Sequence, residues 1–326
     1  MDIDSFFRLF FIHLPYANVE VFIPALLFIG FSVRVVSAFL GIGGAWLVTP
    51  ALNILGFPMA YAIGTDIAHV GAKGMLATFF HARRKHVDFA LALCMVGGTV
   101  IGIEGGARTV MSLEKTQQLE AVLHWVYIVI LFFIALTIFA ERKKRSLHFH
   151  EKILRFSLPP IIHFKVSNIS CSVWVPVGIG LISGFVAGFL GIGGGLLRLP
   201  MLLYCMGCPT IIAIGTDLFE VMLSGFYGGF SYALKGRVDF LAALLMFLGA
   251  AAGTKFGVIA AERSSDQNIK SRFGIGVVGC LISILLKEFN YPLLSKLVIF
   301  SLMLFLVLSI LRVFFVSRKV IDTSHL

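Results

Sequence analysis

The sequence Phe-Leu-Gly-Ile-Gly-Gly occurs at residues 39–44 and returns unchanged at residues 189–194. Each copy is followed by a proline, Pro50 in the first case and Pro200 in the second. Glycine clusters and prolines that interrupt apolar segments at matching places of two halves are typical of binding sites in membrane transporters. This stretch therefore predicts a duplicated fold and the place of a site within it.

The duplication continues downstream of the glycine run. The sequence Ala-Ile-Gly-Thr-Asp at 62–66 returns at 213–217, and Val-Asp-Phe at 87–89 returns at 238–240. Because the order is kept and the spacing nearly so, we predict two homologous repeats.

Composition places these repeats in a lipid bilayer. The 326 residues are 58% hydrophobic and 13% charged, whereas soluble domains carry about 25% charged residues. Their mean hydropathy is +0.95. Apolar stretches such as 121–140 meet the requirement of about 20 residues for crossing a membrane as a helix. We predict an all-α polytopic membrane protein with two homologous four-to-five-helix repeats, about 8–9 transmembrane helices in total.

Apolar periodicity and length locate the individual segments. The expected helices lie at 21–40, 64–82, 89–108, 121–140, 173–190, 215–234, 239–261, 273–287 and 297–316. The apolar pieces 45–55 and 195–206 reach only ~18 Å as helices. Each is therefore half of a glycine-broken helix or a re-entrant segment. A re-entrant piece predicts four crossings per repeat and parallel repeats, whereas a crossing piece predicts five and inverted repeats; the distribution of charge does not decide between them.

The net charge of +10 has a topological explanation. The basic run 142–145 directly follows an apolar segment, as expected of a cytoplasmic loop under the positive-inside rule. This interpretation argues against nucleic acid as a partner. The predicted organisation is an interfacial N-terminal lead-in at 1–20, transmembrane repeat 1 at 21–140, a basic cytoplasmic connector at 141–171, transmembrane repeat 2 at 172–290, and a C-terminal helix and tail at 291–326.

Glycines four residues apart recur in the third helix of each repeat. Such spacing places them on one helical face, where a neighbouring helix can approach closely. We interpret these glycines as structural. They are Gly98, Gly102 and Gly106 in one repeat and Gly249, Gly253 and Gly257 in the other.

Ionisable residues inside apolar segments are costly and usually mark a transport pathway. Asp66, His69 and Lys73 share one face of the expected helix 64–82. The aligned positions of the second repeat are Asp217, Glu220 and Ser224. A Gly-Thr-Asp sequence before an apolar run is also how a helix start is capped, and capping ranks slightly above ligand contact for the two aspartates. Local pairing is the alternative for the other charged residues.

The glycine runs have two competing interpretations, a structural hinge and a substrate site built from freed backbone amides, and the second is slightly favoured. Arg198 follows the second run, where its counterpart is Val48, and a fixed cation there favours an anionic ligand, although it could instead extend toward lipid headgroups. The candidate substrate-binding residues are Gly41, Gly43, Gly44, Gly191, Gly193, Gly194, Gly195, Arg198 and Lys73. The candidate ion-coupling residues are His69, Glu220, Asp66 and Asp217.

Other chemistries find little support in the chain. The glycine run lacks the strand and helix context of a dinucleotide fingerprint. Cys205 and Cys208 have no second pair or histidine cluster that would complete a zinc site. Ser224 lacks the surroundings of an activated nucleophile. We expect no enzyme, no cofactor and no metal.

The combined motifs, each present twice, resemble those of the sulfite exporter TauE/SafE family of membrane transporters. The resemblance covers nearly all of residues 20–290, and the second glycine run, which continues into Gly195, is the closer match; Ala45 replaces that glycine in the first. It implies a secondary transporter of small sulfur-containing anions, such as sulfite or organosulfonates, coupled to protons, in the bacterial cytoplasmic (inner) membrane. A passive anion channel and, more remotely, an intramembrane enzyme are alternatives. The identity of the anion, the direction of transport and any homo-oligomer stay open.

Overall fold

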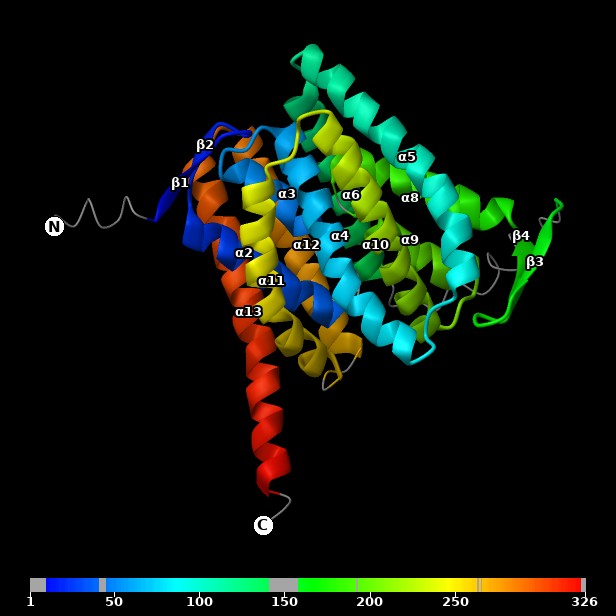
Figure 1. Ribbon diagram of the computed structural model, residues 1–326. Coiled ribbons are helices and arrows are strands. Elements are labelled where there is room, and N and C mark those ends of the chain that lie inside the picture. Colours follow the sequence, from blue (N-terminus) through cyan, green and yellow to red (C-terminus); the bar gives the residue numbers. More distant parts are fainter. Residues whose placement is uncertain are drawn as a thin grey trace, which may run out of the picture. The chain divides into compact units, whose positions relative to one another are not determined.

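The computed structural model describes residues 10–40, 45–140, 158–191, 193–262, 264 and 266–323, and these residues are mainly helical (Figure 1). The elements of the first repeat are α2 (Ile23–Leu40), α3 (Ala45–Ile54), α4 (Met59–Arg83), α5 (Phe89–Lys115) and α6 (Leu119–Ala140). Those that follow are α8 (Trp174–Leu190), α9 (Gly195–Pro200), the π-helical turn η1 (Met201–Cys205), α10 (Thr210–Leu234), α11 (Phe240–Glu262), α12 (Asp266–Glu288) and α13 (Pro292–Thr323).

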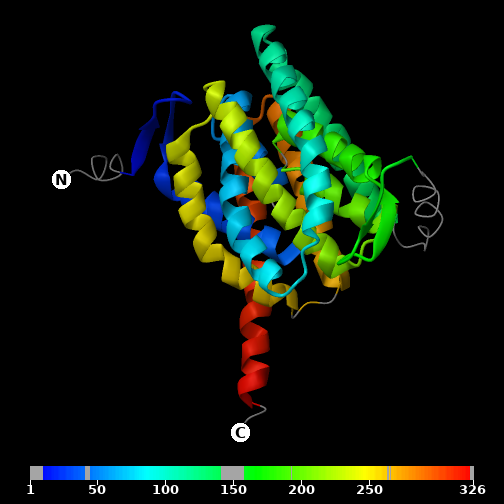
Figure 2. The same cartoon turned by 45° about the vertical axis from the view of Figure 1, so that its right-hand side comes forward.

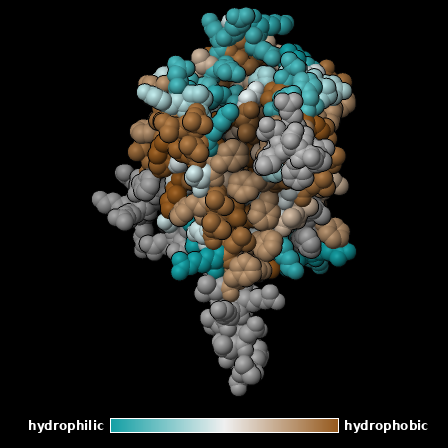
Figure 3. Space-filling view, turned by 90° about the vertical axis from the view of Figure 1, so that its left-hand side faces the viewer, coloured by the Kyte–Doolittle hydropathy of each residue, from teal (hydrophilic) through white to brown (hydrophobic). Residues whose placement is uncertain are grey.

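Several of these helices can cross a membrane. By length and composition, α5, α6, α10, α11 and α13 each contain a span of sufficient hydropathy, and α2 and α8 contribute shorter apolar helices. On the face shown in Figure 3, apolar side chains form a broad middle band with hydrophilic side chains at its ends. An all-α, multi-pass membrane protein is thereby confirmed.

One β-hairpin precedes the first helix of each repeat, and neither hairpin was predicted from the sequence. Strand β1 (Phe11–Leu14) pairs with β2 (Val19–Phe22), and β3 (Ile161–Phe164) pairs with β4 (Ile169–Ser172), both antiparallel. Their turns contain Asn18 and Asn168, with φ of 51° and 54°. Asparagine tolerates this left-handed conformation better than most residues. The structural duplication thus includes segments that looked like a lead-in and a connector.

The contacts divide the chain into two compact units that interleave the repeats. Unit 1 comprises residues 1–59, 120–141 and 239–326, and unit 2 comprises 60–119 and 142–238. In unit 1, α2 packs along α11, visible in Figure 1 as blue beside yellow. In unit 2, α5 packs along α8. Each unit therefore pairs the first helix of one repeat with the third helix of the other.

The glycine stripes create these two interfaces, as expected. A Cβ added to Gly98, Gly102 or Gly106 would overlap the backbone of α8. A Cβ added to the stripe of α11, formed by Gly249, Gly253 and Gly257, would overlap the backbone of α2 or the Cβ of Ala38 on it. Missing side chains allow the dispersion contacts that hold helices together in lipid.

The equivalent helices α4 and α10, both in unit 2, run in opposite directions. Gly71 of α4 lies against Gly225 of α10, whereas Gly74, further along α4, lies against Met222, earlier on α10. Figure 2 shows the two helices, in cyan and yellow-green, side by side. Because α4 and α10 occupy the same place in their repeats, this pairing agrees with the inverted alternative and not with the parallel one.

The starts of α4 and α10 correct one interpretation of the two repeated aspartates. Each helix begins directly after a proline, Pro58 or Pro209, and so about two turns before Asp66 or Asp217. Proline is favoured around a helix start because it has no amide hydrogen to leave unpaired. Both aspartates therefore lie inside a helix, and capping was the wrong explanation for them.

The caps are provided by the other repeated aspartate pair. The Asp88 carboxylate accepts a hydrogen bond from the Leu91 amide at 3.2 Å, and that of Asp239 accepts one from the Ala242 amide at 3.0 Å. Asp88 is also bound by Ser167, whose hydroxyl donates to it at 2.9 Å from the second hairpin turn. The Val-Asp-Phe motif thus fixes where the third helix of each repeat begins.

Candidate functional site

The second glycine run forms a turn between α8 and α9. Gly191, Gly193 and Gly194 have φ of 77°, 71° and 65°, a region that residues with a side chain rarely adopt. The chain can therefore leave α8 and start α9 within a few residues. The first run supplied three predicted site residues, Gly41, Gly43 and Gly44, which lie outside the residues that the structure describes.

Some amides of the second run are already hydrogen-bonded. The Gly191 amide donates to the Ala187 carbonyl at 2.8 Å and ends α8, while the Gly195 amide donates to the Gly193 carbonyl at 2.7 Å. These two amides cannot bind a ligand in this conformation. Gly193 and Gly194 are thus the remaining candidates for backbone donors in this turn.

Arg198 lies at the centre of a buried ion cluster in unit 2. Its side chain is 0% exposed, its Nε donates to Asp217 Oδ1 at 2.8 Å, and its Nη1 contacts a carboxylate oxygen of Glu220. Both partners come from α10. With all three groups ionised, the cluster carries a net charge of −1. Arg198 therefore does not extend to lipid headgroups, and its charge is more than balanced inside the protein.

One edge of the Arg198 guanidinium remains directed at the glycine turn. A Cβ added to Gly194 would lie 2.5 Å from Nη2. Nη2 is buried and finds no hydrogen-bond acceptor within the described part of the chain. A buried donor without an acceptor lowers the stability of the folded protein. An anion that accepts a hydrogen bond from this edge would therefore bind more favourably here than beside the paired nitrogens.

The polar row of α10 continues from this cluster. Glu220 is 0% exposed and Ser224 is 5% exposed. The Ser224 hydroxyl donates to Glu220 Oε2 at 3.3 Å. Glu220 therefore lies between a cation and a hydroxyl, and its protonation would change both interactions.

The corresponding row of α4 is also buried in unit 2. Asp66, His69 and Lys73 are 0%, 1% and 5% exposed. Asp66 Oδ1 lies 3.8 Å from His69 Nδ1, one helical turn away. The structure thus brings Asp66 and His69 together, and places Lys73 one further turn along the helix.

The two rows belong to helices that touch. Gly71 stands between His69 and Lys73 on α4, and its contact Gly225 follows Ser224 on α10. Glycines at the crossing let the two backbones meet close to both sets of ionisable groups. Among the described residues, no group of three or more His, Cys, Asp or Glu side chains could hold a metal ion.

A set of polar residues elsewhere was not predicted to form a site. In unit 1, Asn53, His124, Lys287 and Glu288 form a hydrogen-bonded cluster. The separations in sequence are too large for local periodicity to reveal it, although a histidine within the apolar stretch 121–140 was a visible signal.

Comparison with known proteins shows which family the sequence resembles. The sequence model described as "Sulfite exporter TauE/SafE" matches residues 26–286. The chain is similar to the probable membrane transporter protein YunE of Bacillus subtilis (strain 168), with 26% identity over 78% of this chain and 95% of the relative.

Two other organisms contain relatives that are also named probable membrane transporter proteins. A probable membrane transporter protein of Xylella fastidiosa (strain 9a5c) is 28% identical over 76% of this chain and 88% of its own length. The probable membrane transporter protein MJ0441 of Methanocaldococcus jannaschii is 24% identical over 79% and 94%. No solved structure matches the chain.

These findings identify a membrane transporter of a small-molecule substrate and not an enzyme. The family match includes both glycine runs and both polar rows. The chain belongs to the sulfite exporter TauE/SafE family.

Proposed function

We propose that this transporter carries small sulfur-containing anions, such as sulfite or organosulfonates, together with protons across the bacterial cytoplasmic membrane. The observation that carries the proposal is the Arg198 Nη2 edge, which is buried, directed at the Gly194 turn and without an acceptor among the described residues. A guanidinium N–H suits an oxyanion, because charge-assisted hydrogen bonds to anions are short and strong. Nε and Nη1 are engaged by Asp217 and Glu220, so Nη2 is the donor proposed for the anion.

The anion is proposed to bind between Arg198 and the turn. The amides of Gly193 and Gly194 are the backbone donors proposed for the second repeat. Gly41, Gly43 and Gly44 are proposed to play the same part in the first repeat, with Lys73 as a second cation. Sulfite and sulfonates offer three oxygens on one small centre, which matches several converging donors.

Proton coupling follows from the charge of the Arg198 cluster. Two carboxylates and one guanidinium repel an approaching anion when all are ionised. Protonation of Glu220 removes one negative charge and releases Nη1 from its ion pair. The anion and the proton thus assist each other's binding and cross in the same direction. His69 is proposed as a second proton carrier, with Asp66 and Asp217 adjusting the charge around the two groups.

Replacing Glu220 with glutamine tests the coupling. In liposomes containing the purified protein, we expect sulfite flux to rise as pH falls and to follow an imposed proton gradient. Glu220→Gln should make flux insensitive to the gradient, because the side chain no longer titrates. Glu114→Gln is the matched control, since Glu114 pairs with Arg237 at 2.9 Å and is partly exposed. Unchanged proton dependence in Glu220→Gln would rule out this coupling group.

A binding screen tests the anion class directly. Sulfite, sulfate, thiosulfate and organosulfonates are added to purified protein, and the unfolding temperature is recorded. A ligand of the folded state stabilises it in proportion to ln(1 + [L]/Kd). We expect stabilisation by sulfite or a sulfonate, and its loss in Arg198→Lys. Two results would contradict the proposed site. One is that none of these anions raises the unfolding temperature of the unmodified protein, and the other is that the anions raise the unfolding temperature of Arg198→Lys as much as that of the unmodified protein.

A further inference from the structure

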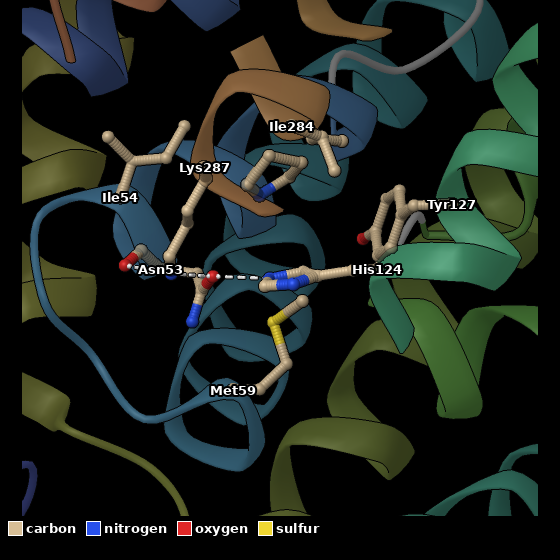
Figure 4. Close-up of a pocket in the computed structure, with 8 residues that line it drawn as sticks. Asn53, Ile54, Met59, His124, Tyr127, Ile284 and Lys287 are labelled. Atoms are coloured by element: carbon tan, nitrogen blue, oxygen red, sulfur yellow. Dashed lines mark hydrogen bonds between the residues drawn. The ribbon is translucent and has the colours of Figure 1, made fainter. Parts of the chain in front are cut away.

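A second buried polar cluster lies in unit 1, at the C-terminal end of α3, and the proposed function makes no use of it. Figure 4 shows His124 reaching from α6 to Asn53 at the end of α3, with Lys287 descending from α12. His124 and Asn53 are 6% and 4% exposed. Glu288 of α12 completes the cluster, with Oε2 2.8 Å from His124 Nδ1.

The hydrogen bonds of Asn53 fix the orientation of its side-chain amide. Its Nδ2 donates to the Phe57 carbonyl at 3.0 Å. The Lys287 ammonium donates to the Asn53 carbonyl at 3.0 Å and also contacts Oδ1. An ammonium group has only donors, so the atom facing it must be the amide oxygen. Asn53 therefore presents an acceptor to any further neighbour.

His124 is placed between two acceptors. Its Nε2 lies 3.1 Å from Asn53 Oδ1, and its Nδ1 lies 2.8 Å from Glu288 Oε2. A neutral imidazole carries one donor and one acceptor, whereas the protonated ring carries two donors. Only the protonated ring satisfies both bonds with an ionised Glu288. We propose that His124 is a proton-binding site that fastens the C-terminal end of α3 to α6 and α12.

Charges of both signs surround this proposed site. Lys287 opposes a positive ring and Glu288 favours it, and Glu120 of α6 and Lys296 of α13 act electrostatically on the Lys287 ammonium. The charges around the ring are therefore mixed, and the case for a proton rests on the two acceptors that face its nitrogens.

The adjoining cavity restricts what can bind there. It has a volume of about 10 Å³, and Asn53, His124 and Lys287 are among the residues that line it. That volume holds no more than one water molecule. A transported anion does not fit, so the ligand of this site is a proton. The His124 site therefore differs from the Arg198 cluster in its ligand, which is a proton and not an anion.

Loss of the proton has a local consequence. A neutral ring must turn a lone pair toward either Asn53 Oδ1 or the Glu288 carboxylate, and one bond becomes a repulsion between acceptors. Asn53 belongs to the last turn of α3, the short helix that follows the first glycine run. Rising pH is therefore expected to loosen this end of α3.

Hydrogen exchange of the purified full-length protein tests the inference. The reporters are the amides of Leu55 and Phe57, which donate to the carbonyls of Ala51 and Leu52. After correction for intrinsic rates, their protection should fall by up to tenfold per pH unit between about pH 5.5 and 8.5, because one proton is linked to the closed state. In His124→Gln this slope should vanish.

A matched control is His163→Gln, because the His163 ring bonds Ser170 on an exposed hairpin. Its slope should equal that of the unmodified chain. Equal slopes in His124→Gln and the unmodified chain, or a flat profile in the unmodified chain, would overturn the proposal. These readings need no substrate, so they remain informative if sulfite is not transported.

A direct measurement covers the case in which His124→Gln does not fold. Nitrogen NMR of protein labelled only at histidine distinguishes a ring with two protonated nitrogens from a neutral one. We expect one buried signal to be fully protonated at pH 6 and to lose a proton at higher pH, and Glu288→Gln should shift that loss to lower pH. A His124 ring that is neutral at pH 6 would refute the inference.

Discussion

The short helix α3 and the segment α9–η1 follow two copies of the same glycine run, yet they are held in different ways. Helix α3 has ten residues and is fastened at its end through Asn53. Segment α9–η1 has six helical residues, changes into a π-helical turn, and is fastened near its start by Arg198. The residue of α3 that corresponds to Arg198 is Val48, and the residue of η1 that corresponds to Asn53 is Leu203; both are apolar.

This difference separates the features that the two repeats share from those in which they differ. The glycine run and the proline that follows it are shared in sequence, although Pro200 is the last residue of α9 and Pro50 lies inside α3. A polar anchor sits at a different position in each copy. Segment α9–η1 holds a charged side chain, Arg198, beside the turn, whereas α3 holds an uncharged amide, Asn53, at its far end and receives the charge from Lys287 of α12. The break is common to both copies, whereas the chemistry is particular to each.

The largest effect is expected for the anchor of α9. Arg198→Ala leaves Asp217 and Glu220 buried without a counter-charge, which should lower the free energy of unfolding by about 3–5 kcal/mol. The aligned change Val48→Ala in α3 only shortens a buried apolar side chain and should cost about 2 kcal/mol. Unfolding of the purified variants, followed by circular dichroism, measures both.

A compensated variant separates the ion cluster from simple packing at this position. Arg198→Leu combined with Asp217→Asn and Glu220→Gln should recover most of the stability but not transport. If Arg198→Ala proves as mild as Val48→Ala, the difference between the two anchors disappears.

The next effect concerns the glycine turn beside α9. Gly194→Ala places a side chain at φ 65° and 2.5 Å from Arg198 Nη2. The backbone conformation alone costs about 1–2 kcal/mol, and displacement of the guanidinium should also weaken anion binding. Gly178→Ala in α8 is the control, because an added Cβ there meets nothing within 4 Å. Equal thermal stability of the two variants would argue against a tight fit at the turn.

A smaller effect is expected for the anchor of α3. Lys287→Met removes the ammonium that donates to the Asn53 carbonyl at the end of α3. Because Lys287 is partly exposed, water can replace the bond, and the loss should be about 1 kcal/mol. Urea unfolding of this variant beside Lys296→Met, whose residue lies on the neighbouring helix α13, isolates the role of the anchor. A larger loss in the Lys296 variant would contradict it.

The last prediction concerns a labelling rate and not stability, and it tests how tightly the chain is closed after η1. Burial, with a contribution from the Asp88 carboxylate, raises the pKa of the Cys208 thiol to about 12. Since the thiolate is the reactive form, maleimide labelling at pH 8 should be roughly a thousandfold slower than for an ordinary cysteine. Mass spectrometry of Cys208 before and after unfolding measures the ratio. Rapid labelling of the folded protein would indicate that this end of α9–η1 opens.

Several features of the fold could be predicted because they depend on local sequence. The stripe of Gly98, Gly102 and Gly106 predicted a close helix contact, since missing side chains are visible in the sequence. The partner helix was not predictable, because α5 meets a helix of the other repeat. The hairpins were missed because Asn18 and Asn168 were not recognised as turn residues.

The candidate site was predictable in parts. Arg198, Asp217 and Glu220 were each selected for being ionisable in an apolar segment, but their mutual pairing depends on how α9 folds back on α10. The starts of α4 and α10 were misplaced because Pro58 and Pro209 were overlooked. His124 and its partners could not be found, because Asn53 and Glu288 are 71 and 164 residues away.

By itself, the sequence determined that this chain is a duplicated helical membrane protein with a break in each half, because hydropathy, glycine spacing and repetition are properties of neighbouring residues. Tertiary structure alone decided that α4 and α10 run in opposite directions, that Arg198 is held by two carboxylates, and that His124 lies between two acceptors. Those features arise where segments distant in the chain are forced together, and there burial makes each unpaired charge or hydrogen bond costly.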